Sequence, residues 1–238
     1  MQGKLGEPAL IRRRTRTSWV GRLWTPRVLL LSGAAFVTGA TVLAADPFAR
    51  IEGVVGQVRF QDKALTASSI VSSEGWIETG PKSKVTLVFL GKDTSVKLAE
   101  KTKIFLARPD PEKGVYELTS GACLWSVKKD SPGKAWVRIR TRAAVMGVRG
   151  TQFIAKFEPL LGEAEVVVYE GKLEFGKTFT GMTSGQLVEI GEGQWGGLGG
   201  RFGNDLRKPL TLSAPVLDVL RSAFDADVAA TPKAQEAK

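Results

Sequence analysis

The residues best placed to contact a ligand alternate along one short segment: Trp136, Arg138, Arg140 and Arg142. Alternate residues of a β-strand face the same side, so these four share one face and the intervening Val, Ile and Thr share the other. Three guanidinium groups beside one indole could bind a carboxylate-rich protein, a glycan or lipid phosphate. The same pattern fits an edge strand whose like charges oppose aggregation. Both interpretations stay open, and Arg149 is a further candidate for the same surface.

The amino-acid composition argues against an enzyme. The chain contains no histidine, which removes the commonest general base and a frequent zinc ligand. Its single cysteine, Cys123, cannot form an intramolecular disulfide or a Cys-rich metal site. Cys123, Trp125 and Val127 share one strand face, which predicts that they are buried in the core. With the acidic residues dispersed, we expect a protein that is not an enzyme and holds no metal or cofactor.

A second group of residues invites a binding interpretation but has a simpler structural one: Gly147, Gly150, Thr151 and Gly171. A Gly-x-x-Gly-Thr turn can hold an anion with its backbone N–H groups. Glycines also supply positive φ or allow strands to approach closely, and the threonine would then begin the next strand. We favour the structural role, and by the same reasoning Glu170-Gly171 predicts a hairpin turn.

From Ile51 to Trp195 the hydrophobic pattern alternates with period two, and turn residues recur every ~8–12 residues. This spacing predicts an all-β fold, either an antiparallel sandwich or roll or a solenoid-like domain. No helical segment long enough for a parallel crossover separates the strands. The predicted strands are 51–60, 85–90, 95–98, 104–107, 115–118, 123–127, 136–141, 151–157, 165–169, 172–175 and 186–190.

The two ends of the β domain, predicted at residues 46–195, differ from it in composition. Residues 196–212 are Gly-rich and read as a connector. Ser213 can cap a short helix over 213–225 that carries Pro215 in its first turn, and its apolar face predicts docking on the sheet or on a partner. Residues 226–238 read as a disordered tail.

The N-terminal segment 1–45 has the order of an export signal. It holds seven Lys and Arg and one Glu, or +6 of the chain's net charge of +10, and residues 28–45 are uncharged. This predicts a signal peptide cleaved just before Asp46 or, if uncleaved, a single membrane anchor through residues 28–45. Because the basic excess lies there rather than in the folded domain, we expect no nucleic-acid partner.

Three stretches, in order, resemble the FecR-type periplasmic domain. The first is 73–80 with the following strand 83–91, the second is Thr141–Phe153, and the third is 167–173 completed by 184–187. The second is the most specific, since an apolar strand followed by Gly-Thr and an aromatic strand start is the family's hallmark. Together they span roughly residues 51–195 and imply a β domain outside the cytoplasm.

The family resemblance also implies a role in signalling. Its best-understood members are membrane-spanning regulators whose cytoplasmic domain controls an extracytoplasmic-function sigma factor. Their periplasmic part senses a TonB-dependent outer-membrane transporter, often one for ferric siderophores. This sequence departs from that plan, because only 27 residues precede the apolar run, too few for a folded anti-sigma domain.

The sequence therefore predicts a non-catalytic, periplasmic, FecR-like module that binds or scaffolds proteins of the cell envelope. The expected partner is another envelope protein, such as an outer-membrane transporter or an anchored regulator, and a glycan is a second option. Strand addition at open sheet edges is the expected mechanism. The alternative is an inner-membrane sensor or regulator, with a periplasmic C-terminal domain, that takes part in sigma-factor or iron-uptake signalling.

Overall fold

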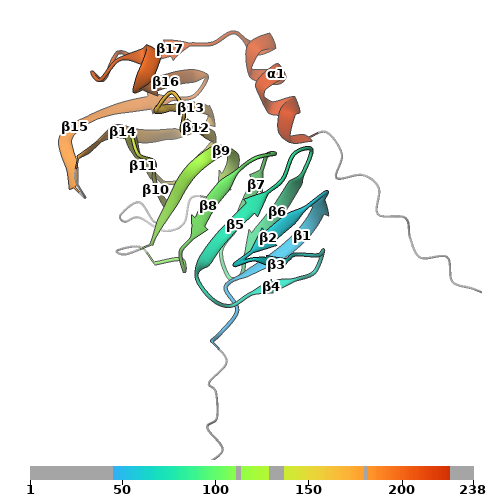
Figure 1. Cartoon of the computed structure of the whole chain (residues 1–238). Coiled ribbons are helices and arrows are strands. Elements are labelled where there is room, and N and C mark those ends of the chain that lie inside the picture. Colours follow the sequence, from blue (N-terminus) through green and yellow to red (C-terminus); the bar gives the residue numbers. More distant parts are fainter. Residues whose placement is uncertain (1–44, 111–113, 129–136, 180–181, 226–238) are drawn as a thin grey trace, which may run out of the picture. The chain divides into compact units, whose positions relative to one another are not determined.

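A computed structural model describes residues 45–110, 114–128, 137–179 and 182–225, and these form an all-β domain with one helix (Figure 1). The predicted fold class is confirmed. Sheet A has the strand order β4 (Ile70–Val71), β1 (Ala49–Val55), β6 (Lys84–Phe89), β7 (Thr94–Leu98), β9 (Val115–Val127), β12 (Gln152–Glu158), β13 (Glu163–Glu170), β16 (Gln194–Leu198) and β17 (Leu210–Thr211). Sheet B has the order β3 (Lys63–Ala64), β2 (Val58–Phe60), β5 (Gly75–Thr79), β8 (Lys103–Leu106), β9, β10 (Val137–Arg140), β11 (Ala144–Val148), β14 (Lys172–Phe179) and β15 (Met182–Gly191).

Strand β9 belongs to both sheets. Its first half pairs with β8 and β10 in sheet B, and its second half pairs with β7 and β12 in sheet A. The strand changes sheet at Gly121, which has φ +83°, and a Cβ there would lie 2.5 Å from the Cα of Thr102. Only glycine combines this conformation with so close an approach. The sequence predicted two separate strands here, at 115–118 and 123–127.

The inner faces of the two sheets form the main core. Phe48, Phe89, Tyr116 and Trp125 make an aromatic cluster in it, with centroid distances of 4.9–6.5 Å between neighbouring rings. Cys123 is fully buried on the same strand as Trp125, whose Nε1 donates to the cysteine Sγ at 3.2 Å. Burial raises the pKa of the Cys123 thiol to about 12, so the thiol stays protonated. The predicted burial of Cys123, Trp125 and Val127 is confirmed.

Three residues of the predicted glycine motif, Gly150, Thr151 and Gly171, lie at a corner where the chain passes from one sheet to the other. Gly150 and Gly171 have φ +63° and +80°, and a Cβ on Gly171 would lie 2.5 Å from the Gly150 carbonyl oxygen. Thr151 is buried, and its hydroxyl donates to the Lys172 carbonyl at 2.8 Å. Gly150 and Gly171 thus have positive φ at a close approach of the chain, and the structural role of the motif stays a prediction. Gly147 instead lies within β11, opposite Arg138 and Glu174.

The hairpin predicted at Glu170-Gly171 is wrong. Strand β13 before it pairs with β12 and β16 in sheet A, whereas β14 after it pairs with β11 and β15 in sheet B. A glycine with positive φ serves a sheet-to-sheet corner as readily as a hairpin, so the local sequence could not separate the two.

Helix α1 (Ala214–Asp225) packs on the outer face of sheet A (Figure 1). Phe224 is buried there against Leu124, Ile154 and Val167. The Tyr169 hydroxyl donates to the Leu217 carbonyl at 3.1 Å. The predicted helix is thus present, and its docking on the sheet is confirmed.

The segment before α1 differs from the prediction. Residues 196–198 continue β16, a 3-10 turn follows at Gly200–Phe202, and β17 precedes the helix, so 196–212 is not simply a connector. Gly196 faces Ile190, where a Cβ would collide with that side chain, so this glycine allows β16 to pack closely. The predicted N-terminal signal or anchor and the C-terminal tail fall outside the described residues. Within the described ranges, no helix is both long and apolar enough to cross a membrane.

Candidate partner-binding groove

Strand β10 places the predicted arginine stripe on the outer face of sheet B. Val137 and Ile139 are fully buried, while Arg138 and Arg140 are half-buried and point the other way. The alternation predicted for this strand is therefore present at residues 137–140. Arg142 is exposed just beyond the strand, and Trp136 lies outside the described residues.

Strand β10 is not an edge strand. It pairs in parallel with β9 and antiparallel with β11, so both of its edges carry hydrogen bonds. The interpretation of its arginines as protection for an exposed edge is therefore wrong. The parallel neighbour is the first half of β9, about twenty residues earlier in the chain, and nothing in the local sequence of β10 signals it.

The arginines face different surroundings along the strand. The Arg140 guanidinium bonds the Glu117 carboxylate of β9 at 2.6 Å, so its charge is largely compensated. Arg149 follows β11 at the end where Val148 pairs with Val137, which is the opposite end of the stripe from Arg142. The four described residues of the predicted set therefore do not converge on one point.

Arg140 and Arg142 line two adjoining hollows. One has a volume of about 410 Å³ and is lined by Glu117, Thr119, Arg140, Thr141, Arg142, Phe157 and Pro159. The other has a volume of about 440 Å³ and is lined by Arg142, Ala143, Pro159, Leu160, Leu161, Gly162, Lys177, Leu198, Gly199, Gly200 and Asn204. Because Arg142 and Pro159 belong to both, we treat the two hollows as one basic-apolar groove.

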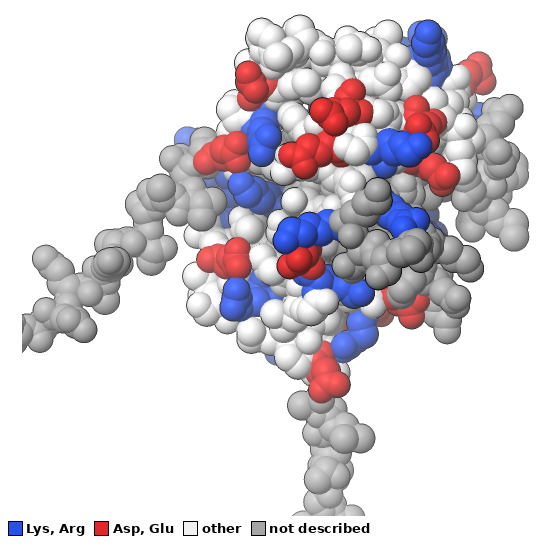
Figure 2. All heavy atoms as spheres, turned by 180° about the vertical axis from the view of Figure 1, so that it is seen from behind, with Lys and Arg blue, Asp and Glu red and all other residues white. Residues whose placement is uncertain are grey.

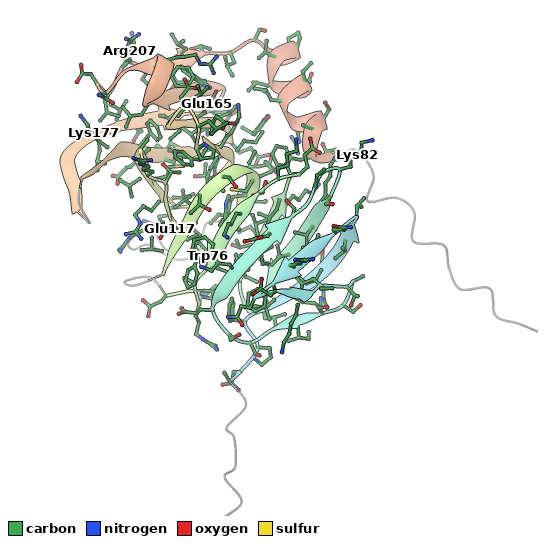
Figure 3. The ribbon with its side chains drawn as sticks, viewed as in Figure 1. Trp76, Lys82, Glu117, Glu165, Lys177 and Arg207 are labelled. Carbon is green, nitrogen blue, oxygen red and sulfur yellow. The ribbon has the colours of Figure 1, made fainter. Side chains whose placement is uncertain are left out.

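Two cations in this groove have no partner among the described residues. Neither Arg142 nor Lys177 makes a side-chain hydrogen bond or ion pair with any described residue. Lys177 comes from β14, opposite Ala144 at the start of β11, and is labelled in Figure 3 with Glu117. The face of the domain seen in Figure 2 carries Lys and Arg as well as Asp and Glu.

The turn between β12 and β13 supplies the apolar side of the groove. Leu160 is 93% exposed and Leu161 is 49% exposed. Exposed leucines at the tip of a turn cost solvation free energy unless a partner covers them. The groove therefore offers positive charge and apolar surface side by side.

An ion pair fixes the wall of the groove behind these leucines. The Glu163 side chain is 1% exposed and accepts three hydrogen bonds from Arg201, from its backbone N at 2.7 Å and from Nε and Nη2 at 2.8 Å. These bonds hold the pKa of Glu163 down at about 2. A Cβ on Gly199 or Gly200 would collide with the β12–β13 turn or with Glu163, so both glycines allow the loop after β16 to lie against that turn.

Sequence reasoning missed Lys177, Leu160 and Leu161. The Pro159-Leu-Leu-Gly162 run was a readable signal, because a hairpin tip with two consecutive leucines is unusual for a solvated turn. Lys177 gave no signal, since its proximity to Arg142 arises from the pairing of β11 with β14. Among the described residues, no cluster of three or more His, Cys, Asp or Glu is arranged to hold a metal ion.

Comparisons with known proteins agree with this fold. The family model described as FecR protein matches residues 76–174, which run from β5 into β14 and include β10 and β11. No curated protein matches the chain significantly. The matched region contains Arg142 and Leu160, whereas Lys177 and Arg201 lie just beyond it.

Solved structures of a candidate anti-sigma factor from Parabacteroides distasonis are also similar. One aligns with a TM-score of 0.50 and 19% identity over 63% of this chain and 65% of that chain. A second aligns with a TM-score of 0.48 and 19% identity over 61% and 64% of the two chains. This chain thus spans about 65% of the length of that protein, and at this identity the first match shows a shared fold. The family model matches residues 76–174, so the predicted resemblance of the β domain to the FecR-type domain is confirmed over that range.

Proposed function

We propose that this FecR domain is a non-catalytic regulatory or signalling module that binds an acidic segment of another cell-envelope protein in the basic-apolar groove. The observation that carries the proposal is that two cations without a described partner, Arg142 and Lys177, lie beside the exposed leucine tip at Leu160. The match to the FecR family supports a regulatory role rather than an enzymatic one.

The groove suits a segment with carboxylates next to apolar side chains. Arg142 can bind a carboxylate through two parallel hydrogen bonds, and Lys177 adds a second charge that steers an acidic partner. Leu160 and Leu161 would lose their exposure to water under the same segment, which gives the bound state its hydrophobic contribution.

Strand β15 supports strand addition as part of the binding mode. It is ten residues long and forms a described ladder with β14 alone, whereas the other terminal strands, β3, β4 and β17, have two residues each. A long unpaired edge can accept an extended segment through backbone hydrogen bonds. Since Lys177 lies on β14, beside β15, a segment leaving the groove would reach this edge.

A photo-crosslinking amino acid at position 160, incorporated in the producing bacterium, tests the groove. The full chain should form a discrete crosslinked product with an envelope protein. The double charge reversal R142E/K177E should reduce that product about tenfold, because both steering and the direct ion pairs are lost.

The matched control is K63E, which reverses an exposed lysine on β3 at the far end of sheet B. This variant should keep the wild-type yield of crosslinked product. Equal yields from K63E and R142E/K177E, with both variants folded, would show that partner binding does not use the groove.

The anchored regulator remains a second candidate, favoured by the uncharged run 28–45 and by the FecR match. In that case the same groove would receive the signal and the N-terminal segment would transmit it across the membrane. The two candidates differ in whether residues 1–45 stay attached to the mature protein.

A further inference from the structure

A second, smaller pocket lies on the outer face of sheet B, at the end opposite the groove. It has a volume of about 150 Å³ and is lined by Arg59, Gln61, Asp62, Trp76, Glu78 and Lys103. Strand β5, which carries Trp76, is four strands away from β11 in sheet B, or about 19 Å at the usual strand spacing. Trp76, labelled in Figure 3, lies in the first FecR-like stretch and has no part in the proposed groove.

The floor of this pocket is a row of directly paired residues. Arg59 of β2 lies opposite Glu78 of β5, and Glu78 lies opposite Lys103 of β8. Lys103 forms an ion pair with Glu78 and lies over the Trp76 ring at 5.4 Å from its centroid. The Phe105 ring meets Trp76 edge to face at 5.4 Å, which holds the indole in one orientation.

The turn between β2 and β3 forms the other wall of the pocket, and two of its residues have an unusual backbone conformation. Gln61 and Asp62 have φ +47° and +66°, values that residues other than glycine rarely adopt. The turn is held to β5, because the Gln61 backbone N–H donates to the Trp76 carbonyl at 3.0 Å and its side-chain amide donates to the Glu74 carbonyl at 2.6 Å. A Cβ on Gly75 would collide with the Gln61 side chain, so this glycine makes room for it.

Two charged groups in the pocket have no described partner. Neither Arg59 nor Asp62 forms an ion pair or a side-chain hydrogen bond with any residue that the structure describes, although both line the same small space. With Lys103 and Glu78 the lining carries two positive and two negative charges, so its net charge is zero. This balance disfavours a phosphate or another anion as the ligand.

We propose that this pocket binds one ring of a neutral saccharide. A cavity of about 150 Å³ accommodates a single six-membered ring. An apolar ring would offer no hydrogen bond to the Arg59 guanidinium or the Asp62 carboxylate, whereas the hydroxyls of a pyranose both donate and accept hydrogen bonds. The C–H face of the sugar would pack on the Trp76 indole.

The test uses fluorine NMR of the full chain labelled with 5-fluorotryptophan. The Trp76 resonance is assigned as the one that is missing from the spectrum of W76F. Three neutral probes are titrated: cellotetraose, maltotetraose and tetra-N-acetylchitotetraose. We expect at least one of them to shift the Trp76 signal saturably below about 10 mM, the range of weak single-ring binding.

The D62G variant removes the unpaired carboxylate while glycine keeps the positive φ of the turn. It should weaken saccharide binding about tenfold, the factor expected when a charged hydrogen bond is lost. The matched control D205G, at an exposed aspartate far along the chain, should bind as the wild type does. No shift of the Trp76 signal with any probe, or equal binding by D62G and the wild type, would overturn the proposal.

Discussion

At the residue scale, the shape of the groove depends on one buried carboxylate. Glu163 begins β13 directly after the leucine turn, and Arg201 belongs to the loop after β16 that forms the facing wall. Because one oxygen of Glu163 accepts both the backbone N–H and the Nε of Arg201, the ion pair fixes the loop as well as the side chain. Glu163 is therefore a positioning residue for the groove.

The ion pair predicts a specific dependence of stability on pH. The folded-state pKa of Glu163 is about 2, below its ordinary value of 4.5, so its contribution is present above about pH 5 and is lost as the pH falls toward 2. We expect the urea midpoint of the wild type to exceed that of E163Q at neutral pH and the gap to close over this window. R201A should remove the same pH-dependent contribution. A gap that stays constant from pH 6 to pH 2, measured by urea denaturation, would contradict it.

Single residues of the groove were only partly predictable from sequence. The outward direction of Arg138 and Arg140 follows from period-two alternation, a local property. The Glu117 partner of Arg140 and the approach of Lys177 to Arg142 follow from the pairing of β10 with β9 and of β11 with β14. Such register contacts join residues far apart in the chain, and no local pattern contains them.

At the element scale, β9 links the two sheets, and Gly121 makes that possible. An alanine there would have to adopt φ +83° with its Cβ 2.5 Å from the Cα of Thr102 and 2.8 Å from the Lys101 carbonyl oxygen. Both neighbouring atoms belong to the backbone, so they cannot move aside cheaply.

The variant G121A should lose about 3 kcal/mol or more of stability through combined strain and overpacking. The control G162A has a similar φ of +65°, but its Cβ would meet nothing within 4 Å. It should therefore lose only the conformational part, about 1 kcal/mol. Urea unfolding of both variants measures the difference, and equal losses would show that the close approach at Gly121 carries no energetic weight.

The order of strands was less predictable than their existence. Alternation and turn residues located most strands, including β6, β7, β12 and β14. They did not reveal that the chain changes sheet after Glu170, nor that β10 lies inside a sheet. The first error arises because a sheet-to-sheet corner and a hairpin use the same turn residues. The second arises because edge strands and inner strands show the same alternation.

At the scale of the whole molecule, the chain combines a β domain that resembles the FecR-type domain with a segment predicted to direct export. The proposed partner groove and the proposed saccharide pocket both open on sheet B, on strands well separated in its order. Helix α1 covers part of the outer face of sheet A instead. The two proposed ligands, a segment of an envelope protein and a saccharide, require the protein to work outside the cytoplasm. The predicted export is therefore the central claim.

The intact mass of the protein recovered from fractionated cells tests that claim most directly. A mass that begins at Ala45 or Asp46, in the soluble periplasmic fraction, is the result that we predict for a free partner-binding module. A full-length mass in the inner-membrane fraction would keep the domain in the envelope but make the anchored regulator the correct candidate. A full-length mass in the cytoplasmic fraction would contradict the account.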